Sequence, residues 1–132
     1  MSTDKKTVNV AIAGMGRVGC TFLEKISSKG ESGVKVIAVA DLSKDAPGIK
    51  VASNLGIKVF EDTKSIVAMG DDVDLIFDLT GSSEARSTIR SELARSGNQH
   101  TVLAPEIVAF LMWNMMGEGE AFPDHHGDNK GY

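Results

Sequence analysis

The chain has 132 residues, a net charge of −4, three prolines and one cysteine. This length gives room for one domain with one core. The chain is acidic and contains no run of basic residues, which argues against nucleic acid or an anionic membrane as a partner. The single cysteine excludes an intrachain disulfide, and no apolar signal segment follows the N-terminus, so we expect a cytoplasmic protein.

Short apolar runs alternate with segments of helical periodicity, which is the pattern of repeated β–α units. The expected strands cover residues 8–13, 34–40, 58–60, 74–79 and 101–103. The expected helices cover residues 17–29, 46–55, 63–69, 83–96 and 105–116, and four of them are followed by the glycines at 30, 56, 70 and 97. Asp62 or Thr63 would cap the third helix, Ser82 or Ser83 would cap the fourth, and Pro105 suits the first position of the last.

Five parallel strands joined by crossover helices predict an α/β fold. The expected sheet is open and doubly wound, of the Rossmann type, with strand order 3-2-1-4-5. Residues 1–7 are expected to be a flexible N-terminus and residues 8–116 to be the folded domain. From residue 117 the composition shifts to Gly, Glu, Asp, His and Asn, so residues 117–132 are expected to form a flexible tail.

A glycine-rich turn, GMGRVG at residues 14–19, follows the first strand and opens the first helix. Its G-x-G-x-x-G pattern in this context is typical of a dinucleotide-binding turn. Gly14 permits the tight turn, Gly16 lets the backbone approach a pyrophosphate, and Gly19 lets the helix pack closely on the sheet. The helix N-terminus offers N–H groups and the positive end of its dipole to the phosphates.

An acidic residue, Asp41, ends the second strand about 20 residues after the turn, which is the spacing of a carboxylate that accepts from the adenosine ribose hydroxyls. The alternative is a plain β–α turn with Asp41 facing solvent. A carboxylate here would repel the 2′-phosphate of NADP, and neither Leu42 nor Ser43 supplies an arginine, although Lys44 lies close. We therefore expect NAD as the cofactor, with NADP the less favoured choice.

Five segments carry a further signal, namely VAIAGMGRVG, VIAVADLS, VFEDTKSIV, DVDLIFDLTGSSEAR and TVLAPE. Over residues 8–116 they resemble the cofactor domain of two-domain oxidoreductases. The nearest groups are the glucose–fructose oxidoreductase/inositol dehydrogenase family and the homoserine and aspartate dehydrogenases. The resemblance implies that the loop of Thr80, Gly81 and Ser82 lies beside the nicotinamide half of the cofactor; Ser82 is alternatively a helix cap. The expected cofactor-binding residues are Gly14, Met15, Gly16, Arg17, Val18, Gly19, Asp41, Leu42, Thr80, Gly81 and Ser82.

The chain departs from these families where they place a catalytic lysine. After the fifth strand it has Ala104 at that position, and we expect no substrate domain after the last helix. We therefore expect no catalytic residue, and the leading hypothesis is a stand-alone NAD(H)-binding module with a cofactor-sensing or regulatory role. The alternatives are an oxidoreductase cofactor subunit whose substrate domain another chain supplies, and a module for another nucleotide-bearing ligand such as coenzyme A.

Three other features contain side chains that are capable of chemistry. Asp78 is either a general base or, as we prefer, an acceptor for loop amides. Cys20 is either a thiolate favoured by the helix N-terminus or, as we prefer, a small core residue. Residues 124–128 (DHHGD), with Glu118 and Glu120 upstream, have metal-capable side chains but no spacing that fixes a geometry, so we expect no metal site.

The last expected helix, residues 105–116, is apolar on nearly every side. One face of a Rossmann helix ordinarily meets water, so the second apolar face needs a cover. The tail or a neighbouring helix is one candidate. We favour a self-association or partner surface with Trp113 as its anchor, which predicts a homo-oligomer or a partner chain bound through this helix.

Overall fold

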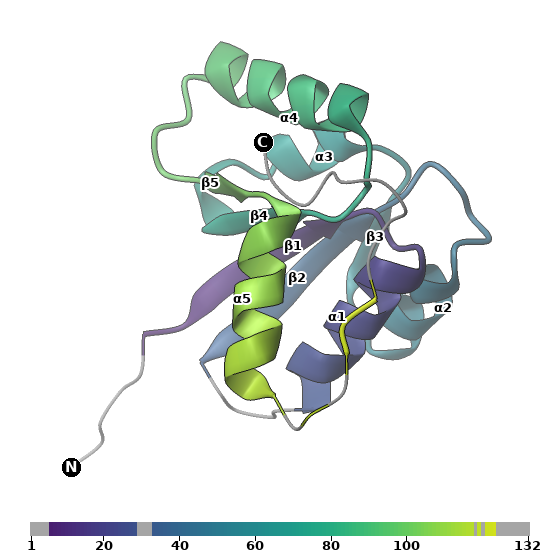
Figure 1. The fold of residues 1–132 in the computed structure, drawn as a ribbon. Coiled ribbons are helices and arrows are strands. Elements are labelled where there is room, and N and C mark those ends of the chain that lie inside the picture. The colour runs from purple at the N-terminus through teal and green to yellow at the C-terminus, as the bar shows by residue number, and fades with distance from the viewer. Residues whose placement is uncertain (1–5, 29–32, 118, 120, 124–132) are drawn as a thin grey trace.

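Five parallel strands in the order β3-β2-β1-β4-β5 form the centre of the computed structural model, which describes residues 6–28, 33–117, 119 and 121–123 (Figure 1). The strands are β1 (Val8–Ala13), β2 (Val34–Ala40), β3 (Lys58–Phe60), β4 (Leu75–Asp78) and β5 (Val102–Ala104). The helices are α1 (Arg17–Ser28), α2 (Pro47–Asn54), α3 (Thr63–Val67), α4 (Ser83–Ser96) and α5 (Glu106–Met116), with a 3-10 turn η1 (Gly70–Asp72). The expected α/β fold, sheet type and strand order are confirmed.

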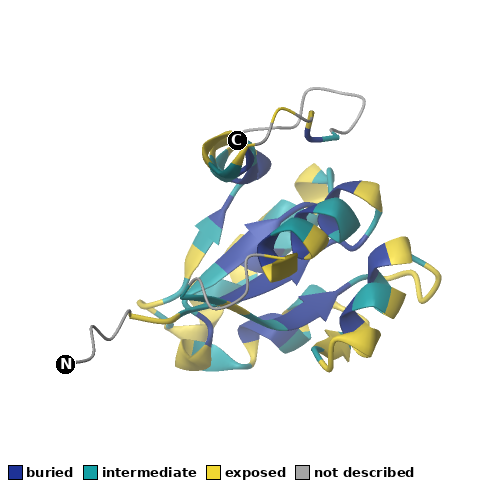
Figure 2. Cartoon of the chain, turned by 90° about the horizontal axis from the view of Figure 1, so that it is seen from below, coloured by how far each residue is buried: buried dark blue, intermediate teal, exposed yellow. Residues whose placement is uncertain are grey.

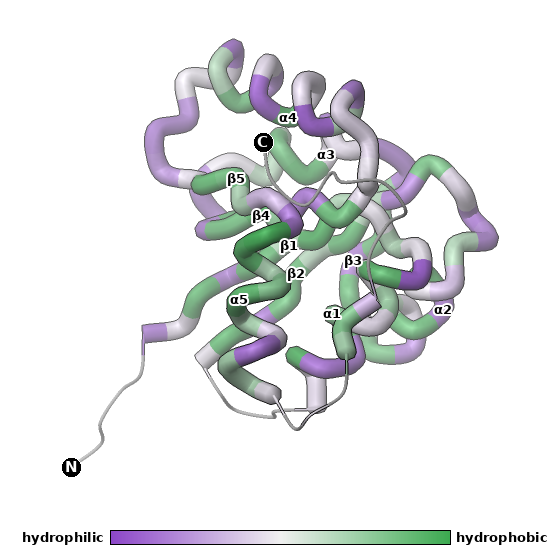
Figure 3. Tube along the Cα trace, in the orientation of Figure 1, coloured by the Kyte–Doolittle hydropathy of each residue, from purple (hydrophilic) through white to green (hydrophobic). Residues whose placement is uncertain are grey.

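The helices cover the two faces of the sheet in two groups. Alternate residues of β1 point to opposite faces, so Val10 and Ile12 belong to one core cluster and Ala11 and Ala13 to the other. The first cluster is completed by α1, α2 and α5, and the second by α3 and α4. The hydrophobic residues of the central strands run through the middle of the molecule in Figure 3. This is why the strands read as nearly continuous apolar runs.

Capping groups decide where α3 and α4 begin. Asp62 rather than Thr63 caps α3, accepting from the Ser65 N–H at 2.9 Å, and Ser82 rather than Ser83 caps α4, accepting from the Ala85 N–H at 3.1 Å. Gly97, in the left-handed region at φ 73°, ends α4 as predicted.

Several predicted boundaries were wrong by one or two residues. Helix α3 ends at Val67 rather than at 69, and β4 is shorter than predicted at both ends. Strand β5 begins and ends one residue later than predicted, and the expected helix 105–116 begins at Glu106 because Pro105 occupies the cap position. At the ends of helices and strands, one hydrogen bond decides whether a terminal residue belongs to the element, and amino-acid composition does not specify that bond.

The inner side of α5 is covered by the chain itself. Trp113 is 5% exposed and stacks on Phe122 with ring centroids 4.8 Å apart, and Phe122 also contacts Phe110 and Phe22. The packed core therefore extends to Phe122, beyond the predicted domain end at residue 116. Trp113 faces this core, so its predicted role as an exposed anchor was wrong. The rest of the predicted tail, apart from residues 117, 119, 121 and 123, lies outside the described residues.

The opposite side of α5 remains exposed (Figure 2). Ile107, Leu111 and Met115 lie four residues apart and are 48%, 57% and 78% exposed. A single turn of an α-helix holds 3.6 residues, so this spacing places the three side chains on one stripe. No helix within the described residues is long and apolar enough to cross a membrane, and the cytoplasmic location stays a prediction.

Candidate functional site

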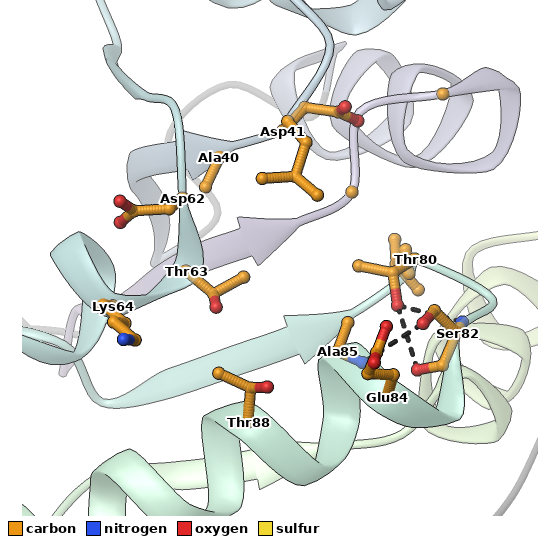
Figure 4. A pocket seen from close by; sticks show the side chains of 14 residues that line it. Ala40, Asp41, Asp62, Thr63, Lys64, Thr80, Ser82, Glu84, Ala85 and Thr88 are labelled. Carbon is orange, nitrogen blue, oxygen red and sulfur yellow. Dashed lines mark hydrogen bonds between the residues drawn. The ribbon is translucent and has the colours of Figure 1, made fainter.

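A cleft of about 660 Å³ opens at the carboxyl end of the sheet, where β1, β2 and β4 finish (Figure 4). The strand order changes direction between β1 and β4, and the carboxyl ends of strands at such a switch point are where open α/β sheets bind ligands. One wall comes from the end of β2 and the start of α3, and the other from the loop after β4 and the first turns of α4. The lining residues are Gly14, Gly16, Ala40, Asp41, Leu42, Asp62, Thr63, Lys64, Leu79, Thr80, Ser82, Glu84, Ala85 and Thr88.

The three glycines of the turn differ in what surrounds them. Gly14 has φ +95°, and a Cβ there would lie 2.7 Å from the backbone of Leu79 and Thr80. A Cβ on Gly19 would lie 1.9 Å from the Gly14 carbonyl oxygen, so this glycine permits the close contact between α1 and the turn. A Cβ on Gly16 would meet no atom within 4 Å, although Gly16 lines the cleft. Two glycines therefore serve packing, and the third leaves room for a ligand.

Helix α1 starts directly at this open position. The Gly16 carbonyl oxygen accepts from the Cys20 N–H at 2.8 Å, which is the first hydrogen bond of the helix. The first N–H groups of a helix have no partner within it, and they carry the positive end of the helix dipole. The cleft wall at Gly16 is therefore suited to an anionic group.

Asp41 lies just beyond β2 and both of its carboxylate oxygens are engaged. Its Oδ2 accepts from the Met15 N–H at 2.7 Å, and its Oδ1 accepts from the Ser43 N–H at 2.8 Å. Each oxygen of an ionised carboxylate has a second lone pair, so Asp41 can still accept from a ligand hydroxyl in the cleft. The carboxylate thus contacts both the glycine turn and the cleft.

The loop after β4 is built on Asp78, which is 4% exposed. Its Oδ1 accepts from the Thr80 N–H at 3.0 Å and from the Thr80 hydroxyl at 2.6 Å. The Thr80 Oγ1 in turn accepts from the Ser82 N–H at 3.1 Å, and Ser82 caps α4 (Figure 4). Our preferred interpretation of Asp78, an acceptor that orders the loop, is confirmed.

Known proteins are similar to this chain in fold rather than in sequence. No family model and no curated protein matches the sequence. A homoserine dehydrogenase from S. aureus is similar in structure, with a TM-score of 0.59 and 17% identity over 87% of this chain and 31% of the enzyme. Scyllo-inositol dehydrogenase from Lactobacillus casei, with bound NAD(H) and scyllo-inositol, has a TM-score of 0.56 and 22% identity over 84% of this chain and 33% of the enzyme. This chain has the Rossmann fold.

The resemblance to homoserine and inositol dehydrogenases, expected from the sequence, is thereby confirmed at the level of the fold. The apo form of the L. casei enzyme is also similar, with a TM-score of 0.56 and 20% identity over 86% of this chain and 34% of the enzyme. The chain spans about a third of the length of these enzymes.

The Rossmann cleft brings together only part of the predicted residue set. The predicted residues that line it are Gly14, Gly16, Asp41, Leu42, Thr80 and Ser82. The predicted residues outside the lining are Met15, Arg17, Val18, Gly19 and Gly81. Met15 and Val18 are buried in the core, at 0% and 2% exposure, so these two side chains support the turn from behind.

The rest of the lining was not predicted as part of the site. Ala40 ends β2 and Leu79 follows β4, and six further residues lie at the cap and start of α3 or in the first turns of α4. These six are Asp62, Thr63, Lys64, Glu84, Ala85 and Thr88. They belong to no glycine motif and reach the cleft only because α3 and α4 pack on the same face of the sheet. Their one available signal was position, since they follow the carboxyl ends of β3 and β4.

Charge in the cleft is mostly negative. Its charged lining residues are Asp41, Asp62, Glu84 and the single cation Lys64. The hydrogen bond from the Ser65 N–H, followed by that from the Ser65 hydroxyl, lowers the pKa of Asp62 below its ordinary value of 3.8, so this carboxylate is ionised at neutral pH. An extra phosphate in this cleft would meet a surplus of carboxylates.

Two further sequence predictions concern chemistry outside the cleft. Burial raises the pKa of the Cys20 thiol, with the charge of Glu24 as a second cause, which disfavours the thiolate interpretation. In the part of the chain that the structure describes, no group of three His, Cys, Asp or Glu side chains could hold a metal ion. The predicted metal-capable segment 124–128, with Glu118 and Glu120, lies outside the described residues.

Proposed function

We propose that the cleft binds a nicotinamide dinucleotide, NAD(H). The observation that carries this proposal is Gly16, where a Cβ would meet no atom within 4 Å at the start of α1. The backbone of Gly14 and Gly16 would hold the pyrophosphate, and the carboxylate of Asp41 would accept from the ribose hydroxyls. The cleft volume of about 660 Å³ lies within the usual range for small-molecule sites. The structurally similar L. casei enzyme has bound NAD(H).

We propose NAD rather than NADP as the preferred form. Three carboxylates and one lysine line the cleft, and Asp41 lies beside the position of the ribose in this proposal. The 2′-phosphate of NADP would add negative charge next to a carboxylate, which Coulomb repulsion opposes.

The role that we propose is to sense or present the cofactor. A bound nicotinamide ring can accept or donate a hydride. Ala104, 4% exposed, stands at the end of β5 where the resemblance implies a catalytic lysine. This position therefore offers no acid–base group for a hydride transfer.

The second candidate is the cofactor subunit of an NAD-dependent oxidoreductase whose substrate domain another chain supplies. It is favoured by the coverage of the similar dehydrogenases, of which this chain matches about a third. Hydride transfer in a cell extract that depends on adding this chain would support the subunit. Inactivity with every fractionated extract, together with measurable NAD(H) binding, would support the sensing role.

Calorimetric titration with NAD, NADH, NADP and coenzyme A tests the binding proposal. We expect the protein to bind NAD or NADH with at least tenfold higher affinity than NADP, which is about 1.4 kcal/mol. Gly16→Val should abolish binding and leave the unfolding temperature nearly unchanged, because its side chain enters open space. The matched variant Gly19→Ala should instead destabilise the fold. Absence of heat with both NAD and NADH would refute the proposal. Coenzyme A that binds equally to Asp41→Ala and to wild type would favour coenzyme A as the ligand.

We also propose that the stripe of Ile107, Leu111 and Met115 on α5 joins two copies of the chain. The only charged residue of α5, Glu106, is 1% exposed, so two such faces can meet without like-charge repulsion. A partner chain is the alternative occupant. Each of the three side chains exposes about half or more of its surface, which is costly for a helix that faces water.

A further inference from the structure

Met15 stands between the first two glycines of the turn, and its backbone is held on both sides. Its N–H donates to the Asp41 carboxylate at 2.7 Å, and its carbonyl oxygen accepts from the Gly48 N–H at 2.8 Å. Its side chain is 0% exposed. Both polar backbone groups of Met15 are therefore satisfied by the protein, the N–H by Asp41 after β2 and the carbonyl oxygen by Gly48 at the start of α2.

Gly48 is a glycine in the first turn of a helix, where this residue is unfavourable relative to alanine. A Cβ there would lie 2.6 Å from the Met15 Cε and 2.8 Å from the Met15 carbonyl oxygen. The absence of a side chain lets α2 approach Met15 closely enough for the hydrogen bond. Contact with the glycine turn thus explains why a glycine stands in the first turn of α2.

The Asp41 contact is a charge-assisted hydrogen bond to a backbone N–H, a strong class of hydrogen bond. Removing the carboxylate leaves the Met15 N–H, next to Gly14 and Gly16, without its acceptor. The adjoining residue Gly16 lines the cleft, and a Cβ on it would meet no atom within 4 Å. A shift at Met15 is therefore passed directly to the backbone that would hold a pyrophosphate.

We propose that Asp41 and Gly48 are positioning residues that hold Met15 and thereby set the shape of the glycine turn. Asp41 then acts on a nucleotide in two ways, by accepting from the ribose hydroxyls and by fixing the turn that binds the pyrophosphate. Gly48 acts in the second way only, since it is absent from the cleft lining. This inference rests on the proposed binding of a dinucleotide.

The test is a cycle of two ligands and three variants, measured by calorimetric titration. ADP carries both ribose hydroxyls and 2′,3′-dideoxy-ADP carries neither, so a residue that acts only through the hydroxyls cannot affect binding of the second ligand. We expect Asp41→Ala to weaken binding of 2′,3′-dideoxy-ADP about tenfold, the scale of one lost hydrogen bond to a charged group. Asp41→Asn should recover most of that loss, because its amide oxygen can accept from the Met15 N–H.

Gly48→Ala should weaken the binding of ADP and of 2′,3′-dideoxy-ADP by the same factor, since it displaces Met15 without contacting the ribose. The matched controls are Asp45→Asn in the loop after Asp41 and Lys50→Ala on α2. Both residues are exposed and neither lines the cleft, so affinities should stay at the wild-type level. Circular dichroism checks that each variant is folded at the titration temperature. If Asp41→Ala is not folded, Asp41→Asn replaces it as the test variant.

The possible outcomes separate the two proposals. Wild-type protein that binds neither ADP nor NAD would refute the proposed function, and this inference with it. Wild-type binding with 2′,3′-dideoxy-ADP affinity unchanged in Asp41→Ala would leave the function standing and overturn the positioning role. If Asp41→Asn is the variant used, its affinity for 2′,3′-dideoxy-ADP should stay close to that of wild type, and a tenfold loss would overturn the role of its oxygen as an acceptor. A loss of 2′,3′-dideoxy-ADP affinity in Asp41→Ala and in Gly48→Ala would establish the positioning role.

Discussion

Trp113 and Phe122 stack with ring centroids 4.8 Å apart and an angle of 19° between their planes. The ammonium of Lys25 lies 5.0 Å from the centre of the Trp113 ring. Phe122 also contacts Phe22 of α1, at 5.8 Å between centroids, so one aromatic side chain joins α5 to α1. The segment after α5 is thus part of what holds the two helices together.

Phe122→Ala should lower the free energy of unfolding by about 3 kcal/mol, because it removes a buried aromatic ring and leaves a cavity. The Trp113 indole should become more accessible to water. Urea unfolding followed by tryptophan fluorescence measures both effects. Leu55→Ala, at an exposed position after α2, is the control and should change stability by less than about 1 kcal/mol. An unchanged unfolding midpoint in Phe122→Ala would contradict the packing role.

Leu111→Glu should convert a dimer into a monomer while the fold is retained. The substitution places a charge in the middle of the stripe of Ile107, Leu111 and Met115, and burying that charge in an interface is unfavourable. Light scattering coupled to size exclusion gives the mass of each form. Lys50→Glu on α2 is a control with the same new side chain. Wild-type protein that remains monomeric at high concentration would exclude the second copy as occupant and leave the partner chain.

Acid should destabilise the protein through Asp74. The Asn9 N–H donates to Asp74 Oδ2 at 2.8 Å and His100 Nε2 contacts Oδ1, and these contacts lower the pKa of Asp74 below its ordinary value of 3.8. A carboxyl whose pKa is lower in the folded state stabilises the protein above its unfolded pKa, and this contribution disappears as the pH falls through the folded pKa. We therefore expect the unfolding temperature to fall as the pH decreases below about 4.

Asp74→Asn should weaken that acid dependence, because the substituted side chain no longer titrates. Thermal unfolding at intervals between pH 6 and pH 2.5 measures the difference. At pH 6 the variant should be less stable than wild type, and the two curves should approach each other toward pH 2.5. Curves that stay parallel over the whole range would show that Asp74 is not responsible.

Ser82→Ala should destabilise the protein by about 1 kcal/mol, the usual effect of losing a helix cap. The Ser82 hydroxyl accepts from the Ala85 N–H at 3.1 Å, and alanine leaves this donor without its acceptor. Ser83→Ala is the matched control, since Ser83 lies inside α4. Equal stability of both variants, measured by urea unfolding, would mean that Ser82 does not cap the helix.

The fold could largely be predicted from local patterns. Strands β1, β2 and β3 and the start of α1 were predicted with their correct bounds because apolar runs, glycines and caps act within a few residues of the chain. The errors in the fold concern the ends of helices and strands, as at Pro105 and β5, where the presence or absence of one hydrogen bond decides the boundary. The exposed stripe on α5 was expected as a surface, but its members differ from the predicted anchor Trp113.

The sequence by itself determined the glycine turn and the acid after β2, which follow from short-range spacing. It also determined the strand order, because right-handed β–α crossovers and the usual switch point restrict how such strands are arranged. Only the tertiary structure decided that Asp41 bonds to the Met15 N–H, that Gly48 approaches Met15, and that Phe122 stacks on Trp113. Two of these pairs join residues more than twenty positions apart, and the third depends on a chain reversal after α5. Such contacts depend on how helices pack on the sheet, and side-chain packing in three dimensions has no periodic signature along the chain.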